Sequence, residues 1–85
     1  MYEITTRNKN IEKRLEEYFN MRRGIREKLI RLKENPRKEI GAHPLHGKLI
    51  GKWGCWLGSN IRMIYTIDDS KKLIIMEAVG SHKIY

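Results

Sequence analysis

The sequence contains a single cysteine, Cys55, so the chain cannot close an internal disulfide. Long apolar runs are also missing, because the longest, Leu73–Met76, is far too short to span a bilayer. Residues 1–10 carry charged side chains and lack the apolar core of a signal peptide. We therefore expect a cytoplasmic protein that makes no use of a membrane.

The sequence contains fewer acidic residues than basic ones. The chain has 18 Lys and Arg against 10 Asp and Glu, which leaves a formal net charge of +8 on 85 residues. Such an excess favours a polyanionic partner, and nucleic acid is the favoured one once membrane insertion is excluded. The alternative is a basic protein whose charge serves solubility alone. A chain this short buries one small core, so residues 1–85 are predicted to form a single domain.

Apolar residues recur at helical spacing in two segments of the first half. The first segment follows Asn8 or Asn10, either of which can cap a helix, and ends near Asn20. The second ends at Asn35, because Pro36 disfavours a helical conformation in the residue before it. The apolar stripes are Ile11, Leu15, Tyr18 and Phe19 in the first helix, and Met21, Ile25, Leu29 and Leu32 in the second. These segments predict an antiparallel helical hairpin.

The remaining segments have the pattern of strands. "MYEITT" predicts a short first strand, residues 37–49 predict a loop, and three strands at 52–57, 61–67 and 72–79 form a meander through the turns "GSN" and "DDSK". The predicted fold class is α+β: an N-terminal strand and a two-helix hairpin packed on a twisted antiparallel sheet. The helices cover one face, and the other face forms a shallow groove.

Arg62 is the first candidate for chemistry, because it interrupts an otherwise apolar central strand. A surface arginine on an open sheet face is the simpler interpretation. If the strands pair as predicted, however, Lys52, Arg62 and the C-terminal "GSHKIY" converge on one face. His82 and Tyr85 then add a proton-transfer group and a phenol, which together resemble the set needed to cleave RNA.

Two further motifs contain histidine or tryptophan. His43 and His46 have the spacing of a ligand pair, but Pro44 lies between them and no cysteine pair joins them, so we predict no metal site and no cofactor. Trp53 and Trp56 have opposite parity on one strand. One of them is expected in the core, while the other can face the groove and stack on a base, although packing alone is the alternative for both.

Four blocks of sequence together resemble the RelE/ParE superfamily of bacterial and archaeal toxins, and most of all its RelE and YafQ-type members. The blocks are "ENPRKE", "HPLHGKLIGKW", "NIRMIYTIDD" and "VGSHKIY", and they cover the chain in the family's order. The resemblance implies two helices on a twisted antiparallel sheet. It also implies an endoribonuclease that cuts mRNA in the ribosomal A site without a metal and is silenced by a co-expressed antitoxin.

The resemblance assigns roles to individual residues. Arg62 takes the place of the family's phosphate-binding arginine, His43 opens the "HPL" motif, and His82 and Tyr85 match the C-terminal histidine and aromatic residue. Three positions depart from the family's pattern, and the gap from His82 to Tyr85 is one residue shorter than in YafQ-type members. Trp53 and Cys55 stand where RelE has a lysine pair, which leaves Lys48 and Lys52 as RNA-binding substitutes. Trp56 stands where YafQ-type members have a histidine, and we expect it to contact RNA.

The resemblance therefore implies a ribosome-dependent toxin, in which the loop before the first strand of the meander supplies His43, Lys48 and Lys52 to the rim of a basic RNA groove. The expected partners are mRNA and an acidic antitoxin, whose amphipathic helix lies along an apolar groove of the helix and sheet surface. Two alternatives remain open: a ParE-like inhibitor of DNA gyrase, which needs neither His82 nor Tyr85, and a non-catalytic RNA-binding or decayed toxin.

Overall fold

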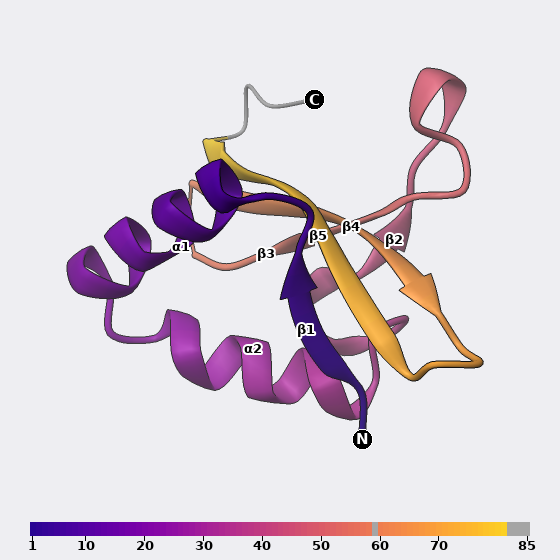
Figure 1. The fold of residues 1–85 in the computed structure, drawn as a ribbon, viewed down its shortest axis with the longest axis horizontal. Coiled ribbons are helices and arrows are strands. Elements are labelled where there is room, and N and C mark those ends of the chain that lie inside the picture. The colour runs from indigo at the N-terminus through magenta and orange to yellow at the C-terminus, as the bar shows by residue number, and fades with distance from the viewer. Residues whose placement is uncertain (59, 82–85) are drawn as a thin grey trace.

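The structure is a computed structural model of the chain and describes residues 1–58 and 60–81. Its elements follow one another as β1 (Glu3–Thr6), α1 (Lys9–Met21), α2 (Ile25–Glu34), the 3-10 turn η1 (Glu39–Gly41), β2 (His43–Pro44), the 3-10 turn η2 (Gly47–Leu49), β3 (Trp53–Trp56), β4 (Ile61–Asp68) and β5 (Leu73–Ser81). Figure 1 shows both helices on the same side of the sheet. The α+β class and the helical hairpin are confirmed.

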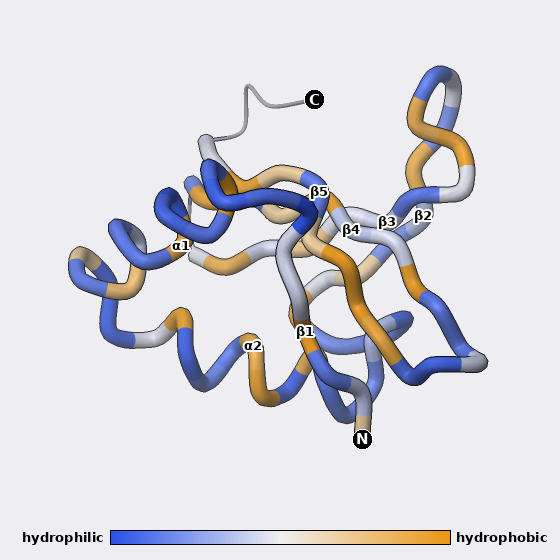
Figure 2. Tube along the Cα trace, viewed as in Figure 1, coloured by the Kyte–Doolittle hydropathy of each residue, from blue (hydrophilic) through white to orange (hydrophobic). Residues whose placement is uncertain are grey.

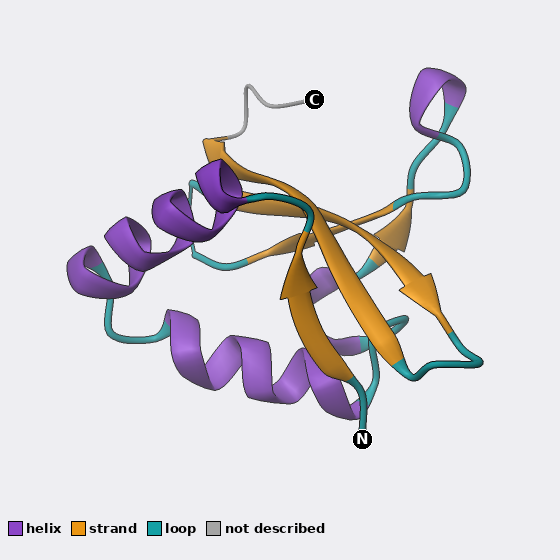
Figure 3. Ribbon diagram, in the orientation of Figure 1, coloured by secondary structure: helices purple, strands orange, loops and turns teal. Residues whose placement is uncertain are grey.

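The sheet has five strands in the order β1-β5-β4-β3-β2. The meander β3-β4-β5 is antiparallel, as predicted, and β2 also joins β3 antiparallel, whereas β1 joins the edge of β5 in parallel (Figure 3). The parallel pairing arises because α1 and α2 return the chain to the sheet before the meander begins. One strand was not predicted: His43 and Pro44 lie inside the expected loop but pair with Gly54 and Trp53.

The start of α1 and the end of α2 each have a local cause in the sequence. Asn8 caps α1, because its side-chain oxygen accepts a hydrogen bond from the Ile11 amide at 3.0 Å. The helix α2 ends at Glu34, followed by Asn35 in a non-helical conformation and then by Pro36. The predicted C-terminal ends of both helices therefore agree with the structure to within a residue. The assignment of Met21 to the second helix is wrong, because Met21 is the last residue of α1 and α2 begins at Ile25.

The core lies between the two helices and the inner face of the sheet. Its most enclosed side chains include Ile25 and Leu32 of α2 and Met63, Tyr65 and Met76 of the central strands, all at 0% exposure. The apolar stretch of β5 runs through the middle of the molecule (Figure 2). The Tyr65 hydroxyl is satisfied there, since it donates to the Pro36 carbonyl at 2.6 Å. No helix within residues 1–58 and 60–81 is long and apolar enough to cross a membrane.

An exposed ion pair ties the segment after α2 to the β4–β5 turn. Arg37 donates to both carboxylate oxygens of Asp69, at 3.1 and 2.8 Å, and Tyr2 donates to the same carboxylate. The hydrogen bond from Arg37, followed by that from Tyr2, lowers the pKa of Asp69 to about 2. Three segments far apart in the sequence therefore meet at one carboxylate.

Candidate nucleic-acid interface

The strand register determines which side chains share the face opposite the helices, here called the open face. His43, Gly54, Ile64 and Ala78 form one cross-strand row, and Trp56, Arg62 and Gly80 form the next. Because side chains alternate along a strand, both rows point away from the core residues Met63 and Tyr65. Arg62 and His43, two residues predicted to act on RNA, therefore lie on the same face.

Arg62 stacks on Trp56. Its guanidinium carbon lies 4.0 Å from the centre of the indole ring, within the range of a cation–π contact. Both side chains are half-buried, and they are direct neighbours across β3 and β4. Trp53, on the other face, packs against the core instead. The two tryptophans therefore lie on opposite faces of the sheet, as their parity predicted, and the contact of Trp56 with RNA stays a prediction.

Gly41 fixes the position of the same indole. A Cβ atom added there would lie 2.9 Å from Cδ1 of Trp56, a distance that real Cβ atoms essentially never show. The backbone of Gly41 also has φ +72°, a conformation that favours glycine. The turn η1 thus approaches Trp56 more closely than any residue with a side chain would allow.

The orientation of His43 follows from its contact with Gly41. Nδ1 of His43 lies 2.9 Å from the Gly41 carbonyl oxygen, which can only accept a hydrogen bond. Nδ1 therefore carries the hydrogen, and Nε2 of the neutral ring is the basic nitrogen. This tautomer suits His43 to accept a proton through Nε2.

Lys52 lies on the open face at the start of β3, and its ammonium contacts a residue that the sequence analysis missed. Nζ of Lys52 is 3.3 Å from Oε1 of Glu77 on β5. Arg7 reaches the same oxygen at 3.3 Å, and Thr66 donates to Oε2 at 3.4 Å. Glu77 is the one charged residue of β5, an acidic group among apolar neighbours, and that was the signal in the sequence.

The other predicted site residues lie elsewhere. Lys48 is exposed on η2, in the hairpin between β2 and β3 that projects beyond the sheet (Figure 1). His82 and Tyr85 fall outside the described residues. Trp53 and Cys55, at the positions of the RelE lysine pair, both face the core and carry no charge. Lys52, the residue before β3, is the nearest cation in the sequence.

Cys55 is not a nucleophile in this arrangement. Its side chain is fully enclosed, and burial raises the pKa of the thiol to about 12. Within the residues that the structure describes, no three His, Cys, Asp or Glu side chains come together to hold a metal ion. Among the described residues, the open face therefore presents the cations Arg62 and Lys52, the imidazole of His43, the indole of Trp56 and the carboxylate of Glu77 that contacts Lys52.

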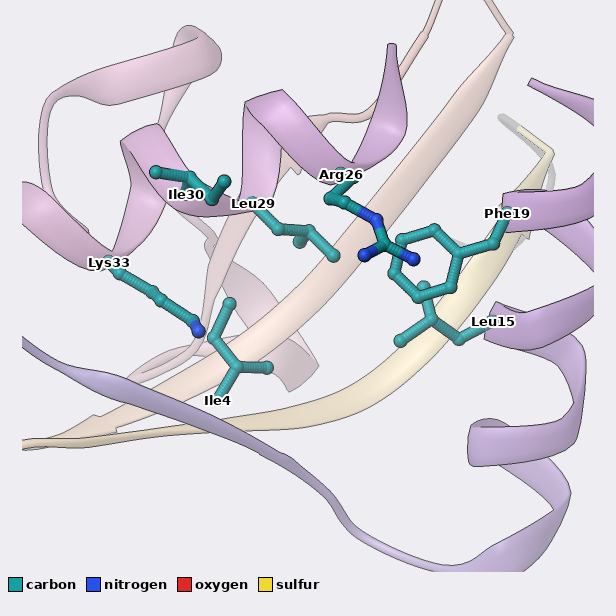
Figure 4. A pocket seen from close by; sticks show the side chains of 7 residues that line it. All are labelled: Ile4, Leu15, Phe19, Arg26, Leu29, Ile30 and Lys33. Carbon is teal, nitrogen blue, oxygen red and sulfur yellow. The ribbon is translucent and has the colours of Figure 1, made fainter. Parts of the chain in front are cut away.

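A second surface lies on the helix side. A groove of about 350 Å³ opens between α1, α2 and β1 (Figure 4). It is lined by Ile4, Leu15, Phe19, Arg26, Leu29, Ile30 and Lys33. Arg26 and Lys33 stand over an apolar floor, and Ile30 is 46% exposed. This set of residues, called the helix groove below, combines an apolar surface with positive charge.

No protein-family model matches the sequence, and no curated protein matches it significantly. Solved structures do match. The YoeB/ParE toxin from Agrobacterium tumefaciens has a TM-score of 0.74 and 21% identity, over 96% of this chain and 99% of that one. A chain of the YoeB–YefM complex from Staphylococcus aureus has a TM-score of 0.70 and 24% identity, over 96% and 98%.

YafQ from E. coli strain BL21(DE3) also matches, with a TM-score of 0.66 and 20% identity over 96% of this chain and 94% of that one. At these identities the likeness is one of fold. The chain has the fold of the YoeB, YafQ and ParE-type toxins, as the resemblance to the RelE/ParE superfamily implied.

Proposed function

We propose that this chain is the toxin of a type II toxin–antitoxin system and an endoribonuclease that cuts mRNA in the ribosomal A site without a metal. The observation that carries the proposal is the stacked pair Arg62–Trp56 on the same sheet face as His43. A guanidinium held on an indole supplies fixed positive charge where a phosphate can lie. The resemblance to RelE and YafQ-type toxins supports this reaction.

RNA cleavage of this kind needs a base, an acid and a cation. The base removes the proton of a 2′-hydroxyl, whose oxygen attacks the adjacent phosphorus, and the bond to the 5′-oxygen breaks as an acid protonates it. We assign the role of the base to His43, because its contact with the Gly41 carbonyl leaves Nε2 as the basic nitrogen, and we assign to Arg62 the neutralisation of charge that develops on the phosphate. His82 and Tyr85 are the proposed source of the acid and of a stacking ring.

We further propose that the antitoxin is acidic and places an amphipathic helix in the helix groove. The apolar floor around Leu15, Phe19 and Leu29 suits the apolar side of such a helix, while Arg26 and Lys33 suit acidic side chains at its edges. The matched YoeB–YefM complex supports a partner of this kind.

Arg62→Ala is the decisive test. We expect growth inhibition and A-site cleavage to fall by roughly a hundredfold or more, the scale of losing one transition-state donor, with little loss of stability. Arg23→Ala, which removes an equal charge from the exposed turn between α1 and α2, is the matched control and should remain active. Wild-type cleavage by Arg62→Ala would contradict the assignment. Inhibition of gyrase with intact mRNA would favour the ParE-like alternative instead.

A further inference from the structure

The Glu77 carboxylate gathers side chains from three other segments of the chain. It receives Lys52 from the start of β3, Thr66 from β4 and Arg7 from the residue after β1. Glu77 itself sits at the irregular part of β5, where the register against β4 shifts between Ile64 and Tyr65. A β-bulge re-aims side chains, and here it directs a carboxylate toward the open face. We call these four residues the Glu77 cluster.

The charges of the cluster do not cancel. Arg7 and Lys52 share a single carboxylate oxygen, so two cations against one anion leave a formal charge of +1. The Glu77 side chain is only 16% exposed, whereas that of Arg7 is 64% exposed. A guanidinium has five N–H donors and an ammonium has three, so both cations keep donors beyond those used by Glu77. The carboxylate thus orients the two cations without consuming their hydrogen-bonding capacity.

The cluster lies at a defined distance from Arg62 along the sheet. Thr66 follows Arg62 by four residues on β4, which corresponds to about 13 Å along the strand. Between them, the open face carries Gly54, Ile64 and Ala78, which bear no charge, and Gly54 and Ile64 are buried. An extended strand of nucleic acid that crosses this uncharged stretch would meet positive charge at both ends.

We propose that Arg7 and Lys52, oriented by Glu77, form a second phosphate subsite that holds a phosphodiester of the RNA other than the one at Arg62. This subsite rests on the proposed function and adds the direction in which the RNA crosses the sheet, from Trp56 and Arg62 toward Arg7. Glu77 is a positioning residue in this arrangement. The cations make the contact with phosphate.

A scan of single phosphates tests the subsite directly. The RNA carries a 2′-O-methyl group at the cleavage position, which prevents cutting, and one neutral methylphosphonate at a time along the strand. Binding of the labelled full-length protein is measured both on ribosomes programmed with this RNA and on the free strand. We expect a methylphosphonate at one position to weaken RNA binding by the wild type by about tenfold and to leave the affinity of Arg7→Ala unchanged. A methylphosphonate at a different position should leave the affinity of Arg62→Ala unchanged.

Salt dependence provides a second measurement. Log affinity for RNA decreases linearly with log salt concentration. The magnitude of this slope should be smaller by roughly 0.7 in Arg7→Ala, the value for one phosphate contact to a single strand, and unchanged in the control Arg23→Ala. Glu77→Gln keeps the side-chain shape but removes the anchoring charge. In this variant, methylphosphonates at several neighbouring positions should each weaken RNA binding slightly, because Arg7 and Lys52 are no longer held at one place.

Three results would overturn the subsite. In the first, each methylphosphonate changes the RNA affinity of Arg7→Ala as it changes that of the wild type. In the second, no single methylphosphonate lowers the RNA affinity of the wild type. In the third, Arg7→Ala weakens binding of the antitoxin and leaves binding of RNA unchanged. The last result would assign the cluster to an acidic protein partner. The proposed function has its own test, because it is contradicted if the wild type cuts no RNA on the ribosome. In that case the scan on the free strand still shows whether the subsite exists.

Discussion

The guanidinium of Arg62 lies 4.0 Å above the indole of Trp56, and the backbone of Gly41 packs against the pyrrole side of the same ring. His43 is bonded to the Gly41 carbonyl, so η1 contacts both the aromatic ring and the imidazole. These contacts join β2, β3 and β4 at one end of the open face. The orientation of Arg62 therefore depends on the position of Trp56, which Gly41 in turn constrains.

Replacing Trp56 tests this dependence. Trp56→Ala removes the ring that supports Arg62 and should lower mRNA cleavage by about tenfold, since a partly desolvated cation–π contact contributes up to about 2 kcal/mol. Trp56→Phe keeps an aromatic face and should fall between the alanine variant and the wild type. Single-turnover cleavage on ribosomes, with protein shown to be folded by circular dichroism, measures the order. Equal activity of all three proteins would mean that Arg62 needs no support.

Gly41→Ala and Gly47→Ala form a matched pair. Both glycines have positive φ, +72° and +66°, so each alanine strains the backbone by roughly 1–2 kcal/mol. A Cβ at Gly47 meets nothing within 4 Å, whereas one at Gly41 collides with Trp56. We expect both variants to lose stability but only Gly41→Ala to lose cleavage, by up to a hundredfold, because a displaced indole carries Arg62 with it. Parallel losses of activity in the two variants would argue that strain alone is responsible.

The Asp69 carboxylate makes stability depend on pH in acid. Its pKa is lowered to about 2 by the hydrogen bond from Arg37 and then by that from Tyr2, so ionised Asp69 stabilises the fold above its unfolded pKa of about 3.9. That contribution disappears as pH falls from about 4 through about 2. The difference in Tm between the wild type and Asp69→Asn should be constant near neutrality and vanish in this window. In an Arg37→Ala background the difference should be small at every pH.

The elements that sequence reasoning located are those with a strong local signal. The apolar stripes ending at Asn20 and Asn35 specified the helices, and the turns "GSN" and "DDSK" specified the meander. The two-residue strand β2 has no such signal, because its pairing depends on Gly54 of a later strand. The parallel edge formed by β1 likewise depends on contacts distant in sequence.

Only part of the candidate site was predicted, because its other contacts also join residues that are distant in sequence. Alternation along the strands placed Arg62 on a different face from Met63 and Tyr65 and put Trp53 and Trp56 on opposite faces, and the structure agrees, but alternation alone left open which tryptophan neighbours Arg62. Glu77 escaped because a single acidic residue in an apolar strand gives no indication of a bulge, and Arg7 escaped because its partner is 70 residues away. Period-two alternation places side chains on a face, but only the three-dimensional register shows which of them meet.

Docking of the antitoxin can be separated from catalysis at Ile30, on the rim of the helix groove. Ile30→Asp introduces a negative charge and removes apolar surface, so binding of the acidic product of the adjacent reading frame should weaken by tenfold or more, a loss of about 1.4 kcal/mol. Cleavage by the free protein should be unchanged. Ile50→Asp, at a residue 78% exposed on the hairpin between β2 and β3, is the matched control for antitoxin binding. Equal affinity of the two variants would place the antitoxin elsewhere.

The C-terminal residues offer the sharpest separation of fold from function. Residues 82–85 follow Ser81, which pairs with Ile61 as the last residue of β5, so their removal leaves every strand pairing of the described sheet in place. Deleting them, or combining His82→Ala with Tyr85→Ala, should keep cooperative unfolding and antitoxin binding close to the wild type. Cleavage should fall by roughly a hundredfold or more, the usual scale for losing a general acid or base. If the shortened protein cut mRNA at the wild-type rate, proton transfer would have to rest on His43, with Arg62 and Lys52 as the cations.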